Sequence, residues 1–188
     1  MIFEGTAISE KICADWISHF DEALDKGRVG DNQLDESTRR SNVRFFSRRH
    51  AAYDHKVFAV LQTIQDLTFD INAQLGVDLD EVLNFQFTKY DGNDFQTYDW
   101  HNDTDMFSGE IRPRKLSISI ALNTQGLHYK GGEFGIKDAL THSFEEKEYQ
   151  LQAGQFLAFP SFYWHKVKPV QEGTRYSIVS WFRGPRWK

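Results

Sequence analysis

The chain has 188 residues, of which 40% are hydrophobic and 15% aromatic, and its formal net charge is −5 at pH 7. A chain of this length can form one domain with a hydrophobic core that needs no metal ion or disulfide bond for stability. The negative net charge argues against a broad nucleic-acid-binding surface, which requires a positive electrostatic potential. We therefore expect a single domain over residues 1–188, rich in β-structure because aromatic residues favour sheets.

Cysteine content and hydropathy indicate the compartment. Cys13 is the only cysteine, so the chain cannot form an internal disulfide, and no leader of signal-peptide type precedes it, which favours the reducing cytoplasm. No apolar run approaches the roughly 20 residues that are needed to cross a bilayer. We expect a cytoplasmic protein without a membrane span.

The N-terminal part, over about residues 8–75, carries two helical patterns. Ser9 is a candidate N-cap, after which apolar residues recur at helical spacing until Gly27. A second pattern runs from about Ala51 to Gln74, and Gly76 lies just beyond its end. Between the two, the arginine-rich residues 27–49 predict a long irregular segment, solvated or salt-bridged.

After Gly76 the pattern changes to period two, which predicts a β-rich core over about residues 82–182. In residues 115–123 the large apolar side chains alternate with Ser117, Ser119 and Ala121, so this strand should line a cavity with its small side chains. The candidate strands are residues 82–90, 115–123, 132–137, 147–152, 155–159, 164–170 and 174–182.

The last two candidate strands carry polar residues on a shared face. Gln171-Glu172-Gly173 predicts a turn that joins them as a hairpin, which would place His165 and Arg175 on adjacent strands facing a common interior. By the same alternation Trp181 lies on the face of Arg175.

A His-x-Asp motif lies upstream of this hairpin. On an extended chain His101 and Asp103 point the same way, so both could bind one ion, with His165 arriving from another strand. Two imidazoles and one carboxylate leave coordination positions open, as in non-haem Fe(II) oxygenases, and Arg175 offers planar donors to a carboxylate cosubstrate. Two alternatives stay open: a zinc hydrolase, which would have no evident use for Arg175, and a non-catalytic metal- or ligand-binding β-barrel module.

Five motifs follow one another in a fixed order along the chain: His101-Asn102-Asp103, Gly131-Gly132-Glu133-Phe134, Leu151-Gln152-Ala153-Gly154-Gln155, Phe159-Pro160-Ser161, and His165 to Val170 followed by Gly173-Thr174-Arg175. This ordered set resembles the Fe(II)/2-oxoglutarate-dependent dioxygenases, in their prolyl 4-hydroxylase-like branch with the bacterial PKHD-type hydroxylases. The resemblance covers roughly residues 82–182 and implies a mainly β (α+β) fold, a double-stranded β-helix of jelly-roll or cupin type with N-terminal helices packed on one sheet.

This resemblance implies that His101, Asp103 and His165 bind Fe(II), and that Arg175 binds the far carboxylate of the cosubstrate 2-oxoglutarate. It also implies O2 as the oxidant, succinate and CO2 as co-products, and ascorbate as an optional reductant. Tyr98 matches a recurring aromatic position.

Further pocket residues follow from the same resemblance. Tyr90 corresponds to a tyrosine that contacts the cosubstrate or the metal-bound ligand, and Trp181 would wall the pocket. Some relatives place a tyrosine where this chain has Ala121, and Ser119, Thr88 or a water could replace its hydroxyl beside the arginine.

The implied reaction is hydroxylation of a C–H bond, with a prolyl residue of a peptide or protein as the leading substrate. A free amino acid, another small metabolite or a nucleobase stays open, because substrate choice in this fold depends on loops. In the family, the region that corresponds to residues 27–49 can cover the active site, which predicts a lid that contacts substrate. A nucleic-acid partner is not expected, and the sequence does not indicate the oligomeric state.

Overall fold

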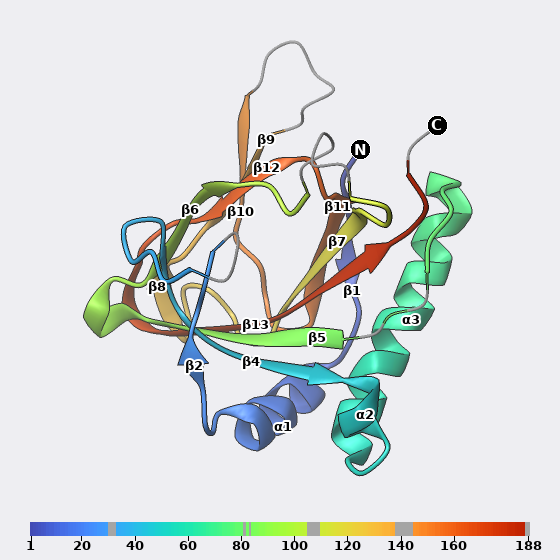
Figure 1. Ribbon diagram of the computed structural model, residues 1–188. Helices are drawn as coiled ribbons and strands as arrows, with labels where there is room; N and C mark the ends of the chain where they lie inside the picture. The colour runs from blue at the N-terminus through green and yellow to red at the C-terminus, as the bar shows by residue number, and fades with distance from the viewer. Residues whose placement is uncertain (30–32, 81, 83, 105–109, 138–144, 187–188) are drawn as a thin grey trace.

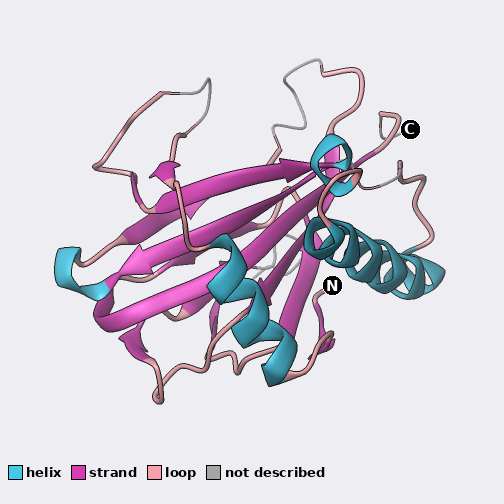
Figure 2. Cartoon of the chain, turned by 90° about the horizontal axis from the view of Figure 1, so that it is seen from below, coloured by secondary structure: helices cyan, strands magenta, loops and turns pink. Residues whose placement is uncertain are grey.

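The computed structural model describes residues 1–29, 33–80, 82, 84–104, 110–137 and 145–186. Two antiparallel sheets face each other (Figure 1), and the helices lie against the outer side of the larger sheet (Figure 2). The expectation of a mainly β chain with helices packed on one sheet is confirmed.

The larger sheet has the strand order β1-β11-β7-β13-β5-β4-β2, and β8 also pairs with β13; the smaller sheet has the order β10-β9-β12-β6-β3. The strands of the larger sheet are β1 (Phe3–Thr6), β2 (Asp25–Lys26), β4 (Asn42–Ser47), β5 (Asn84–Asp91), β7 (Arg114–Ala121), β8 (Tyr129–Gly131), β11 (Gln155–Pro160) and β13 (Val170–Arg183). Those of the smaller sheet are β3 (Arg39–Arg40), β6 (Thr97–His101), β9 (Phe134–Lys137), β10 (Glu146–Tyr149) and β12 (Trp164–Val167).

The helices are α1 (Glu10–Phe20), α2 (Arg48–Ala51), α3 (His55–Leu75) and the short 3-10 turn η1 (Gly92–Asp94). The Ser9 hydroxyl accepts a hydrogen bond from the Ile12 amide, as its N-cap position predicts. At the end of α3, Gly76 adopts a left-handed φ of 65°, which suits glycine. Within the described ranges, none of these helices has the length and apolarity to cross a bilayer.

The prediction that the first helix continues to Gly27 is wrong, because α1 ends at Phe20. Ala23 has a left-handed φ of 51°, which a helix does not permit. The chain then enters β2, which pairs with β4. Strand pairing in the folded protein therefore overrides the local helical pattern.

The prediction of an irregular segment over residues 27–49 is also wrong where the structure describes it, and residues 30–32 lie outside the described part. The segment supplies β3 to the smaller sheet and β4 to the larger one. Val43, Phe45 and Phe46 have high strand propensity, which the surrounding arginines concealed. This part of the chain is thus built into both sheets.

The predicted hairpin with a turn at residues 171–173 does not exist. β12 lies in the smaller sheet, whereas β13 begins at Val170 in the larger one. The chain crosses between the sheets just before that residue, where Pro169 has no N–H to continue a ladder. Gly173 does not form a turn. It allows the backbone of β13 to lie close to that of His128, since a Cβ at this position would be 2.2 Å from the His128 carbonyl oxygen. His165 and Arg175 therefore come from opposite sheets.

Two hydrophobic clusters divide the interior. The first fills the space between the helices and the larger sheet and includes Trp16, Phe20, Val57, Val60, Ile64, Phe85, Phe87, Leu116, Ile118, Ile120, Ile178 and Phe182. The second includes Tyr90, Ala121, Tyr129, Phe134, Ile136, Leu157, Phe159, Tyr163, Val167 and Val170. The apolar face of β7 belongs to the first cluster, which leaves its serine face toward the space between the sheets, as predicted.

We predict that Ile64→Ala lowers the free energy of unfolding by roughly 2–5 kcal/mol, because Ile64 is fully buried where α3 packs on the sheet. Phe69→Ala on the same helix is the matched control: Phe69 is 77% exposed, so its removal should change the free energy by no more than about 0.5 kcal/mol. Urea denaturation of both variants measures the difference, and equal losses would contradict this assignment of the buried face.

Candidate active site

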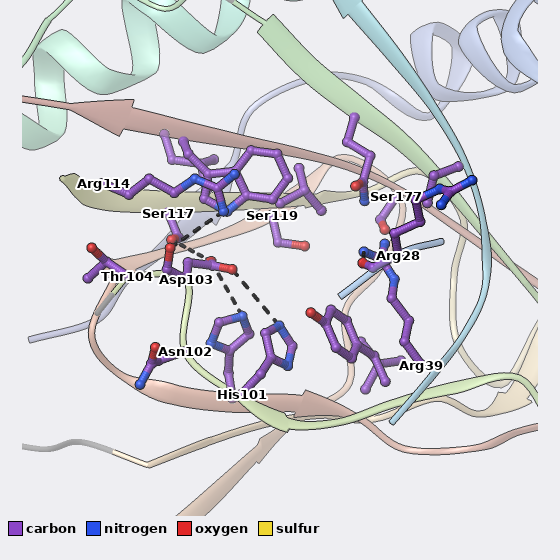
Figure 3. Close-up of a pocket in the computed structure, with 18 of the residues that line it drawn as sticks. Arg28, Arg39, His101, Asn102, Asp103, Thr104, Arg114, Ser117, Ser119 and Ser177 are labelled. Atoms are coloured by element: carbon purple, nitrogen blue, oxygen red, sulfur yellow. Dashed lines mark hydrogen bonds and ion pairs between the residues drawn. The ribbon is translucent and has the colours of Figure 1, made fainter. Parts of the chain in front are cut away.

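A cavity of about 1120 Å³ lies between the sheets and is lined by strands of both. Figure 3 shows the side chains that converge on it. All the site residues that the sequence predicts line this one cavity: His101, Asp103, His165, Arg175, Tyr90, Ser119 and Trp181.

Three of these residues form a compact group at the smaller sheet. In the ladder between β12 and β6, His165 pairs directly with His101. Asp103 follows the end of β6, and its amide donates to the Ser161 carbonyl at 2.9 Å. An Asp103 carboxylate oxygen lies 3.9 Å from Nε2 of His101, and the other lies 3.5 Å from Nε2 of His165.

The tautomers of the two histidines follow from their backbone contacts. Nδ1 of His101 lies 2.8 Å from the Asp99 carbonyl oxygen, and Nδ1 of His165 lies 3.0 Å from that of Tyr163. A carbonyl oxygen only accepts, so each Nδ1 carries the proton and each Nε2 keeps a lone pair. Both lone pairs are thereby available to a metal ion.

The charge state of the group also suits a cation. Burial, together with neighbouring His165, lowers the pKa of His101 to about 3, so this imidazole is neutral at pH 7. Burial alone would raise the pKa of Asp103, but the two histidines and the Ser117 hydroxyl hold it below its usual value. That hydroxyl donates to the carboxylate at 2.7 Å, as the dashed line in Figure 3 marks.

These three residues fit a divalent ion such as Fe(II). Their ligand atoms all lie within 4.8 Å of one another. Nitrogen and oxygen donors from two imidazoles and one carboxylate are the set that non-haem iron sites use, and it leaves positions for other ligands. The backbone carbonyls and Ser117 supply the supporting hydrogen bonds that orient such ligands.

Arg175 lies in β13, on the opposite sheet from the histidines. Its side chain is 2% exposed, and its guanidinium donates to the Ser177 hydroxyl at 3.1 Å. Among the described residues, no carboxylate lies within ion-pair distance of it. Since a buried charge without a counterion is costly, this guanidinium is suited to an anionic ligand in the cavity.

Tyr129 is a site residue that the sequence reasoning missed. Burial raises the pKa of its phenol, while the charge of Arg175 and a hydrogen bond to that guanidinium lower it. Both side chains converge over Gly132, where a Cβ would lie 3.1 Å from Cδ of Arg175 and 3.2 Å from Cε2 of Tyr129. Ala121 offers no hydroxyl here, and Thr88 is already engaged by Gln86.

The remaining predicted residues lie next to Arg175 or farther along the cavity wall. Tyr90 pairs with Arg175 in the ladder of β5 and β13, and the guanidinium lies 5.5 Å from the centre of its ring. Ser119 points into the cavity from β7 (Figure 3). Trp181 lies farther along β13, with the Arg114 guanidinium 4.2 Å from its ring centre.

Tyr98 packs directly on a metal-binding candidate. Its ring is stacked on that of His101, with 3.5 Å between the ring centres, and burial raises the pKa of its phenol to about 12. On its other side the Arg39 guanidinium lies 4.5 Å from the ring centre. The sequence reasoning placed Arg39 in an irregular segment and missed its position in the cavity wall.

Comparison with known families gives one match that covers half of the chain. The model of the 2OG-Fe(II) oxygenase superfamily matches residues 85–183. A PKHD-type hydroxylase of Idiomarina loihiensis is 29% identical over 102 residues, which are 54% of this chain and 42% of that relative. The chain spans about half the length of the curated relatives that it matches.

Solved structures share the fold. A prolyl-4-hydroxylase of Pseudomonas putida superposes with a TM-score of 0.77 at 21% identity, covering 97% of this chain and 92% of that one. A prolyl hydroxylase of Trichoplax adhaerens superposes with a TM-score of 0.77 at 14% identity, covering 96% of this chain and 82% of that one. That structure is a complex with a peptide fragment of the hypoxia inducible factor oxygen degradation domain. The expected double-stranded β-helix is thereby confirmed.

We predict that His165→Ala weakens binding of Mn(II), an oxygen-stable probe for Fe(II), by more than the roughly 10–100-fold that loss of a supporting hydrogen bond costs. The reason is that the variant removes one of three ligand atoms. His55→Ala, at the exposed start of α3, is the control and should leave the affinity unchanged. Titration calorimetry measures both, and unchanged affinity in His165→Ala would contradict the assigned site.

Proposed function

The chain belongs to the 2OG-Fe(II) oxygenase superfamily, and from this membership we propose that it is an Fe(II)- and 2-oxoglutarate-dependent dioxygenase that hydroxylates a C–H bond. One observation carries the proposal. Two imidazoles with free lone pairs and one carboxylate share a cavity with a buried guanidinium that has no carboxylate partner among the described residues.

We assign His101, Asp103 and His165 to Fe(II) and Arg175 to the far carboxylate of 2-oxoglutarate. When bound, iron with 2-oxoglutarate and O2 supplies the oxidising chemistry, which yields succinate, CO2 and a hydroxylated substrate. The protein contributes position and charge: the carbonyls behind each imidazole hold the ring nitrogens toward the ion, and Ser117 orients the carboxylate.

The residues around Arg175 and the remaining cavity residues would shape the binding sites. Tyr90 and Tyr129 flank Arg175 and keep its guanidinium directed at the ligand. Ser119 offers a hydroxyl that points into the cavity (Figure 3). Trp181 walls the cavity and, with Arg114, reduces access of water to the reacting carbon.

The leading substrate is a prolyl residue of a peptide or protein. The names of the relatives support this choice, since they are PKHD-type and prolyl hydroxylases, and one solved neighbour was bound to a peptide. A cavity of about 1120 Å³ leaves room for a chain segment beside the cosubstrate. A free amino acid, a small metabolite or a nucleobase is the alternative for the same chemistry.

We further propose that residues 1–188 act as one oxygenase domain, with helical support over about 8–75 and the β core over about 82–182. The proposed compartment is the cytoplasm, because the single cysteine, Cys13, is a buried free thiol that suits a reducing environment. Contact of this part of the chain with substrate is supported by the residues from β2 to β4 that line the cavity: Asp25, Lys26, Arg28, Arg39, Val43 and Phe45.

The proposal predicts formation of succinate when the protein is given Fe(II), 2-oxoglutarate, O2 and ascorbate. Prolyl peptides should increase the rate and gain the mass of one oxygen atom, measured by mass spectrometry. Asp103→Ala is the matched inactive variant. If the wild-type protein binds metal and 2-oxoglutarate but forms no succinate with any candidate substrate, the non-catalytic binding module is favoured.

We also predict that Tyr129→Phe raises the Kd for 2-oxoglutarate of the Mn(II)-loaded protein roughly tenfold, because a hydrogen bond to a charged group is lost. Tyr176→Phe is the control: it removes a phenol on the other face of β13, where the hydroxyl donates to Asp21 at 2.7 Å. An equal effect of the two substitutions, or none in Tyr129→Phe, would argue against a role for Tyr129 at the cosubstrate.

A further inference from the structure

Two arginines of the cavity wall are almost completely buried, and the proposed function accounts for one of them. Arg175 is 2% exposed and Arg39 is 8% exposed. Neither has a carboxylate within ion-pair distance among the described residues. 2-Oxoglutarate has two carboxylates, of which Arg175 takes one and the metal the other, so Arg39 is left without a counterion.

Arg39 is held in place by the protein. Its Nε donates to the Ser41 hydroxyl at 2.8 Å, and its Nη1 donates to the Arg28 carbonyl at 3.0 Å. Gly27 passes directly against the guanidinium, because a Cβ there would lie 2.6 Å from Nε and 3.0 Å from Cζ. The ring of Tyr98 covers another side. This guanidinium is therefore fixed before any ligand arrives.

All of these partners are neutral. A hydroxyl, a carbonyl and an aromatic face offset part of the cost of a buried charge, but they do not neutralise it. Nη2 donates to no acceptor among the described residues. Asp25 also lines the cavity but forms no ion pair with Arg39. Of the five N–H groups of this guanidinium, two thus have an acceptor among the described residues, and three are left for a ligand.

The position of Arg39 relates it to the reacting centre. Tyr98 lies between the Arg39 guanidinium and the ring of His101, in contact with both. Figure 3 shows Arg39 and Arg28 on one side of the metal-binding group and Arg114 on the other. Nearby Lys26 already pairs with Glu36 at 2.5 Å. A ligand near the metal therefore meets, at Arg39, a fixed cation that has no carboxylate partner among the described residues.

We propose that Arg39 binds a carboxylate of the primary substrate, so that the preferred substrate is acidic close to the oxidised carbon. This inference rests on the proposed function. In a prolyl peptide the carboxylate has two possible sources, an Asp or Glu side chain next to the proline, or the C-terminal carboxylate of a terminal proline. Both present the planar acceptor that a guanidinium fork matches.

The test compares matched pairs of substrates by kcat/KM, measured as succinate formed and oxygen gained. One arm pairs peptides with Asp or Glu beside proline against their Asn or Gln counterparts. The other arm pairs peptides with a C-terminal proline against their C-terminal amides. In one arm we expect the wild-type protein to have a kcat/KM about tenfold or more higher for the carboxylate than for its amide. The arm that shows this difference identifies the source of the carboxylate.

Arg39→Met should reduce that preference to about twofold or less and leave the Kd for 2-oxoglutarate, measured with Mn(II), nearly unchanged. Arg39→Lys keeps the charge but loses the fork, so an intermediate preference is expected, and this variant serves if Arg39→Met does not fold. Arg40→Met is the matched control, because Arg40 is exposed and donates to the Phe95 carbonyl.

Two results would overturn the proposal. One is equal kcat/KM for carboxylate and amide in both arms with the wild-type protein. The other is a variant in which the affinity for 2-oxoglutarate falls while the substrate preference persists, since Arg39 would then belong to the cosubstrate. Failure of the proposed function itself is distinct: the wild-type protein would form no succinate with any compound.

Discussion

The pairing of β12 with β6 is the constraint on which the candidate active site depends, because it places His165 directly opposite His101. The carbonyls that fix both imidazoles belong to Asp99 in β6 and to Tyr163 directly before β12. The Ser117 hydroxyl donates to the Asp103 carboxylate at 2.7 Å and opposes the rise in its pKa that burial alone would cause. A shift of one residue in this ladder would turn His165 to the outer face of the sheet, so the register determines whether a metal site exists.

The cavity wall contains two buried positive charges. Arg39 and Arg175 are enclosed, oriented by neutral hydrogen-bond acceptors, and without carboxylate partners among the described residues. Each costs stability in the absence of a ligand. Proteins accept such a cost where it improves binding, and a chain with a net charge of −5 has here concentrated positive charge at one internal site.

Local patterns in the sequence were sufficient for those parts of the site in which one strand determines the outcome. Alternation in residues 115–123 and 174–182 identified the cavity faces of β7 and β13, and His-x-Asp identified two neighbouring members of the candidate metal-binding group. The end of the first helix at Gly27, the irregular segment and the hairpin after His165 were predicted wrongly, because pairing between distant strands decides each of them. Tyr129 was missed because a three-residue strand leaves no periodic signal.

The two halves of the candidate site belong to different sheets: the candidate metal ligands come from β6, from the residues directly after it and from β12, and Arg175 comes from β13. Facing sheets are kept apart by the side chains between them, at a spacing of about 10 Å, and here Phe134 and Phe159 are among those side chains. The distance between the candidate metal-binding group and Arg175 therefore depends on the thickness of this layer of side chains. That distance determines the length of dicarboxylic acid that can contact both. Larger or smaller residues in that layer would change which acid fits, even though they touch neither of its ends.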